Sequence, residues 1–95
     1  METQKLIVAF TEFFKSEGIK LGSEKVFYTQ EEWRARHEEY CNNSKLVVVY
    51  DGGAHRDAMT LDGMNYKLNQ RMQDMLNKLG YYFEESTRWY GGVYS

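Results

Sequence analysis

The sequence predicts an α+β fold: a small antiparallel or mixed sheet of three to four strands, with about three helices packed mainly on one face. Three observations lead to this prediction. Residues 3–17 and 64–79 repeat apolar side chains every three or four positions, as amphipathic helices do. Residues 46–50 form an unbroken apolar run between turn residues, which is typical of a buried strand. Two aromatic segments, 81–83 and 89–94, suit neighbouring strands. The expected order is α-(β)-α-β-α-β-β.

Length and composition favour one soluble domain covering residues 1–95. Twelve basic and fourteen acidic residues give a net charge of −2, which argues against strong attraction to nucleic acid or to an anionic membrane. The single cysteine, Cys41, excludes an internal disulfide and suits a reducing cytosol. Apolar runs are far shorter than the roughly 20 residues that cross a bilayer, so we expect a cytoplasmic protein without a membrane partner.

In the first half of the chain, the first helix carries Leu6, Phe10 and Phe14 on one face and ends at Gly18. A short strand is expected at residues 26–28. The second helix begins with a capping box, in which Thr29 and Glu32 satisfy each other's backbone donors, and is expected to run to about Cys41.

In the second half, residues 45–50 are predicted to form a central strand covered on both faces. Met59 and Leu61 are expected to form the second arm of a hairpin. The third helix would be capped by Asp62 and end at Gly80. Its apolar stripe comprises Met64, Leu68, Met72, Met75, Leu76 and Leu79.

Candidates for chemistry are few. His37 and Cys41 are four residues apart on the expected second helix, a spacing that can chelate zinc, but two ligands do not complete a tetrahedral site. In the loop 51–57, His55 with Asp51 or Asp57 would form a base and the group that orients it. Gly52-Gly53 in the same loop is equally a plain turn signal. Phosphate-binding glycine motifs and the Gly-x-Ser-x-Gly motif do not occur, so we expect no enzyme, no cofactor and no metal.

The C-terminal segment is the least ordinary part of the sequence. Residues 81–94 hold six of the fifteen aromatic side chains. A sheet covered on one face buries only alternate residues of each strand, so some of these rings should remain exposed. Tyrosine, tryptophan and arginine are enriched at the centres of protein interfaces. We therefore predict a partner-binding surface with Trp89 and Arg88 as anchors; its further members are Tyr90, Tyr82 and Tyr94.

These observations favour a non-catalytic protein-binding module, acting on another protein or as a homodimer. In size and composition the chain resembles small phage proteins that inhibit host or defence-system machinery, anti-CRISPR proteins among them, which implies an inhibitory role. The alternative is a small nucleic-acid-binding regulator that stacks bases on an aromatic sheet face, although the even charge opposes it. A third hypothesis is a small hydrolase or transferase centred on His55.

Overall fold

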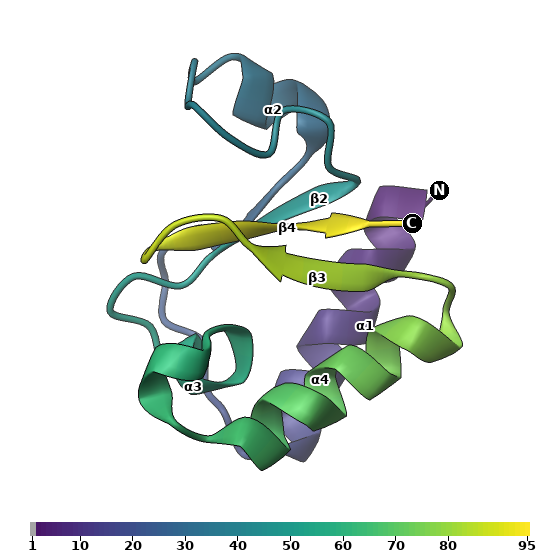
Figure 1. Cartoon of the computed structure of the whole chain (residues 1–95), viewed down its shortest axis with the longest axis vertical. Coiled ribbons are helices and arrows are strands. Elements are labelled where there is room, and N and C mark those ends of the chain that lie inside the picture. Colours follow the sequence, from purple (N-terminus) through teal and green to yellow (C-terminus); the bar gives the residue numbers. More distant parts are fainter. Residues whose placement is uncertain (1) are drawn as a thin grey trace.

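The computed structural model describes residues 2–95 and confirms the predicted α+β class (Figure 1). One sheet contains four antiparallel strands in the order β1-β2-β4-β3. The strands are β1 (Phe27–Tyr28), β2 (Leu46–Val49), β3 (Tyr82–Glu85) and β4 (Tyr90–Tyr94). The helices are α1 (Glu2–Ser16), α2 (Gln30–Arg34), α3 (Arg56–Met59) and α4 (Tyr66–Lys78), with a 3-10 turn η1 (Leu61–Gly63) between the last two.

The main core lies between the sheet and the three helices α1, α3 and α4, which cover one face (Figure 1). The predicted stripes of the two long helices supply it: Leu6, Phe10 and Phe14 from α1, and Leu68, Met72 and Leu76 from α4. These meet Leu46, Val48, Phe83 and Val93 of the sheet. Both long helices stop just before the predicted glycines, Gly18 and Gly80, which take positive φ angles of 73° and 89°.

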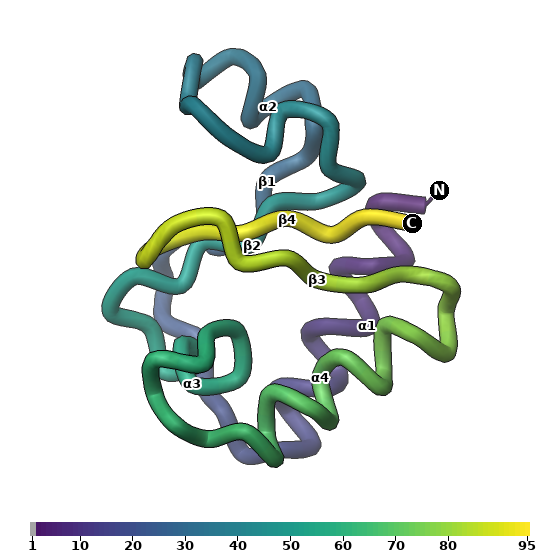
Figure 2. Tube along the Cα trace, viewed as in Figure 1, coloured from purple at the N-terminus to yellow at the C-terminus, as the bar shows by residue number. Residues whose placement is uncertain are grey.

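The opposite face of the sheet carries a smaller core beneath residues 29–45, which we call the cap. Trp33 and Cys41 of the cap pack on Val47 of β2 and Tyr90 of β4. Figure 2 shows the cap projecting from the sheet on the side away from α1 and α4. Because the two cores enclose β2, its residues Leu46, Val47 and Val48 are completely buried, as expected for a central strand.

The predicted second helix is too long. The capping box of Thr29 and Glu32 is present, but α2 ends at Arg34 instead of near Cys41. His37 and Cys41 have positive φ angles of 60° and 69°, which interrupt a right-handed helix. The chain folds back instead, so that the Trp33 indole N–H donates to the Tyr40 carbonyl over 2.8 Å.

Two further predictions between β2 and α4 are wrong. Met59 and Leu61 do not form a hairpin arm: Met59 ends α3 and is buried, whereas Leu61 begins η1. Asn65, not Asp62, caps α4, by accepting a hydrogen bond from the Leu68 backbone N–H. Met64 therefore precedes the helix and is 76% exposed, outside the stripe to which its spacing had assigned it.

Candidate functional site

Of the five residues predicted to bind a partner, Tyr90 is a core residue. Only 2% of it is exposed, and its ring centroid lies 4.7 Å from that of Trp33. Its hydroxyl accepts a hydrogen bond from the Tyr40 backbone N–H over 3.2 Å. Burial raises the pKa of this hydroxyl. Tyr90 thus holds the cap against the sheet, and we remove it from the candidate surface.

Arg88 and Trp89, the predicted anchors, lie between β3 and β4. Arg88 is exposed. Trp89 is half-buried, with its ring centroid 4.5 Å from that of Tyr90 and 6.0 Å from that of Trp33. Truncation of Trp89 would therefore disturb the small core as well as any partner contact, which makes it a poor probe of binding.

Tyr82 and Tyr94 form the exposed part of the predicted surface. They are paired residues of β3 and β4, and their rings stack at 5.8 Å with an interplanar angle of 30°. Tyr82 is 45% exposed, and Tyr94 is half-buried. We call these two residues the tyrosine pair. Desolvation raises the pKa of the Tyr94 hydroxyl, and a hydrogen bond to Cys41 adds to the increase. The pair therefore borders the cap.

Gly91 and Gly92 are both buried inside β4. A Cβ on Gly91 would lie 2.6 Å from the Glu84 carbonyl oxygen, and a Cβ on Gly92 would lie 2.8 Å from the Ser44 Cβ. The two glycines thus allow β3 and the cap to approach the strand closely.

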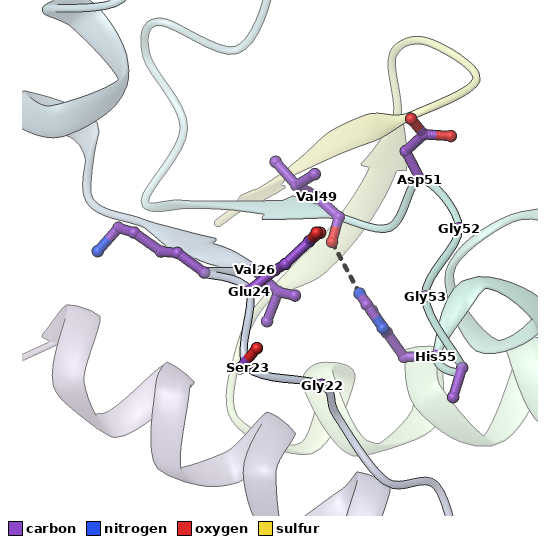
Figure 3. A pocket seen from close by; sticks show the side chains of 11 residues that line it. Gly22, Ser23, Glu24, Val26, Val49, Asp51, Gly52, Gly53 and His55 are labelled. Carbon is purple, nitrogen blue, oxygen red and sulfur yellow. Dashed lines mark hydrogen bonds between the residues drawn. The ribbon is translucent and has the colours of Figure 1, made fainter.

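A second candidate site is a cleft of about 400 Å³ between residues 22–26 and residues 49–55 (Figure 3). Ser23, Glu24 and Val26 stand on one side, and Asp51, Gly52 and His55 on the other. The cleft lies where β2 ends and the chain turns toward α3, within the loop that the sequence singled out.

His55 is the buried polar residue of this cleft, with 2% of its surface exposed. Its Nε2 lies 2.7 Å from the Val49 carbonyl oxygen, and Nδ1 has no hydrogen-bond partner in the protein. Burial lowers the pKa of the imidazole, although the bond to Val49 opposes this. The predicted pairing of His55 with Asp51 or Asp57 does not occur among the described residues, because the ring nitrogens meet a carbonyl and no carboxylate.

His37 and Cys41 do not form a metal site. The helix that would have aligned them ends before either residue. His37 is exposed, whereas Cys41 is buried with its Sγ 3.0 Å from the Ser86 Oγ. Across residues 2–95, no three His, Cys, Asp or Glu side chains gather closely enough to hold a metal ion.

One exposed apolar group near the start of α4 was not predicted from the sequence. Leu61, Met64 and Tyr66 are 52%, 76% and 60% exposed around the start of α4. Met64 also has a positive φ of 57°, an uncommon conformation for a residue other than glycine, asparagine or aspartate. No sequence signal separated these residues from the core, because Met64 fits the apolar spacing of the helix that follows.

No protein family, curated protein or solved structure matches the chain in the three comparisons with known proteins. Within residues 2–95, none of the helices has the length and apolar character needed to cross a membrane.

Proposed function

We propose that this protein is a non-catalytic protein-binding module that contacts its partner through the tyrosine pair. The observation that carries the proposal is the stacking of Tyr82 on Tyr94 on a part of the sheet that the cap leaves open. Helix α2 contacts β1 and β2, whereas Tyr82 lies on β3 at the other edge of the sheet. Large rings held in place by strand pairing lose little conformational entropy on binding, which suits them as anchors.

The outer edge of β3, beside the tyrosine pair, cannot accept another strand at Phe83. The Gln73 side-chain amide donates to the Phe83 carbonyl over 2.8 Å and accepts from the Phe83 N–H over 3.0 Å. An incoming strand would need these same backbone groups. A partner is therefore expected to lie on the face of the sheet and to use side-chain contacts.

The charge next to the pair indicates the chemistry of the partner. Glu84 follows Tyr82 by two positions in β3, so both side chains project from the same face. Glu84 is exposed and would repel phosphate groups, which disfavours the nucleic-acid alternative. It would attract a lysine or arginine at the rim of an apolar protein surface.

A finer form of the proposal is that the partner is a host or defence-system protein and that binding inhibits it. It is supported by the size and composition of the chain, which resemble those of small phage inhibitors. A module of this kind would inhibit by occupying a surface of its target rather than by chemistry of its own.

The test compares two tyrosine variants. Tyr82→Ala removes the exposed ring of the pair, and Tyr66→Ala removes a similarly exposed ring from α4, away from the sheet face. Proteins captured from the source cell by the wild type are identified by quantitative mass spectrometry, and their affinities are then measured with purified components. We expect Tyr82→Ala to weaken binding by about 2 kcal/mol or more and Tyr66→Ala to have little effect.

Two results would contradict the proposal. Equal binding by the wild type and Tyr82→Ala would show that the tyrosine pair is not the contact surface. Tight binding of short oligonucleotides that weakens steeply with salt would favour the nucleic-acid alternative instead.

A further inference from the structure

A groove of about 310 Å³ lies between the last turns of α1 and the segment 18–21 that follows the helix. Phe14 lines it from α1 and is 1% exposed. Ile19 and Leu21 line it from the other side; both are half-buried and pack on the main core. The apolar side chains of the main core therefore reach the surface in this groove.

The groove offers few groups that could form hydrogen bonds with an occupant. Thr11 lines it, but its hydroxyl donates to the Ile7 carbonyl over 2.7 Å and is thus used within α1. The Ile19 N–H donates to the Phe14 carbonyl over 2.8 Å. A peptide lying along these residues would find no partners there for its own backbone groups, whereas an alkyl chain needs none.

Both charged residues that line the groove are lysines, Lys15 and Lys20. They are exposed, and neither forms an ion pair within residues 2–95. The nearby carboxylate of Glu17 is engaged elsewhere, since it accepts two hydrogen bonds of 2.8 Å from the Arg71 guanidinium. The groove is thus complementary to a ligand that is apolar along its length and negatively charged at one end.

We propose that this groove binds an unbranched aliphatic carboxylate of the medium-chain fatty acid class. The alkyl chain lies on Phe14, Ile19 and Leu21, and the carboxylate pairs with Lys15 and Lys20. A volume of about 310 Å³ falls at the lower end of the range of small-molecule sites, which suits a single short chain. The groove is separate from the tyrosine pair, so the proposal does not depend on the partner-binding function.

The test is an NMR titration of the full chain with octanoate, and with octanol, octylammonium and butyrate as comparisons. We expect saturable amide shifts confined to residues 11–21 and nuclear Overhauser contacts between the octanoate methylenes and the Phe14 ring. Octanoate should bind more tightly than octanol or octylammonium, because only the carboxylate is attracted by the two lysines. It should also bind more tightly than butyrate, because the longer chain buries more apolar surface.

The variants separate the contribution of charge from that of the apolar lining. Lys15→Gln combined with Lys20→Gln should weaken octanoate binding by about fivefold to tenfold and leave octanol binding unchanged, because only ion pairs are lost. The control combines Lys5→Gln and Lys78→Gln, which changes the net charge equally at exposed positions outside the groove. This control should bind octanoate as the wild type does.

Several outcomes would overturn the proposal. Octylammonium might not bind less tightly than octanoate, or the shifts could fail to saturate or spread beyond residues 11–21. A capped Leu-Glu dipeptide that bound more tightly than octanoate would also overturn it, by showing that the groove holds a segment of a partner protein instead of a free fatty acid.

Discussion

β3 is an edge strand, and the Gln73 side chain makes the hydrogen bonds that a neighbouring strand would make on its outer side. The side-chain amide makes both hydrogen bonds that the Phe83 backbone would otherwise make to another strand, at 2.8 and 3.0 Å. Phe83 is 5% exposed, and its ring belongs to the main core. Loss of the amide would therefore leave a donor and an acceptor unpaired next to buried apolar surface.

The structure sets the expected size of the effect of Gln73→Ala. A typical hydrogen bond contributes about 0.5–1.5 kcal/mol net to folding, so two bonds contribute about 1–3 kcal/mol. Alanine recovers a few tenths of this amount through its higher helix propensity. We expect a decrease of about 1–2 kcal/mol in the free energy of unfolding.

The measurement is urea denaturation together with hydrogen exchange of the Phe83 amide, which should become faster in the variant. Gln70→Ala is the matched control, since Gln70 lies one turn earlier on α4 and bonds only the exposed side chain of Asp74. It gains the same helix propensity and loses about 0.2–0.5 kcal/mol at most. If the two variants had the same midpoint and the Phe83 amide exchanged at the wild-type rate, the role assigned to Gln73 would be refuted.

Two further predictions concern stability. Leu76→Ala should lower the free energy of unfolding by about 2–5 kcal/mol, because Leu76 is completely buried in the main core; an unchanged denaturation midpoint would contradict this. Burial keeps the folded-state pKa of His55 below 6.5, so the unfolded chain binds the proton first as the pH falls. The free energy of unfolding should therefore be highest above pH 6.5 and decrease as the pH falls below that value toward the folded-state pKa. His55→Gln should remove this dependence and His37→Gln should retain it, as pH-dependent denaturation curves would show.

The sequence predicted the parts of the fold whose stabilising contacts repeat at a regular spacing. The stripes of α1 and α4 and the apolar run of β2 each bury one continuous surface, so periodicity alone located them. Gly18 and Gly80 fixed the ends of the long helices for an equally local reason. The order of the strands was not predictable in this way, since β2 pairs with β4 across the forty residues that separate the two strands.

The candidate sites were predicted less completely because they depend on contacts between distant segments. The aromatic composition of residues 81–94 pointed to Tyr82 and Tyr94, but it also included Tyr90, whose burial depends on Trp33 in the cap. In the same way, the sequence pointed to His55 but predicted that its ring would pair with Asp51 or Asp57, which it does not. The carbonyl that holds its ring belongs to Val49 at the end of β2.

The early end of α2 at Arg34, which the sequence did not predict, helps to explain why the tyrosine pair is exposed. Continuing the helix to Cys41 would have gained surface charge pairs of about 0.2–0.5 kcal/mol each, whereas burial of a large apolar side chain gains about 1.5–3 kcal/mol. The chain therefore turns after Arg34 and brings Cys41 down beside Trp33 in the small core. The five-residue helix that remains is about 7.5 Å long, while four strands span about 14 Å from the first to the last. Helix α2 contacts β1 and β2, and Trp33 and Cys41 of the cap pack on Tyr90 of β4, which leaves the start of β3 at the outer edge of the sheet uncovered. Tyr82 is left at that edge of the sheet, stacked on Tyr94 and open to a partner.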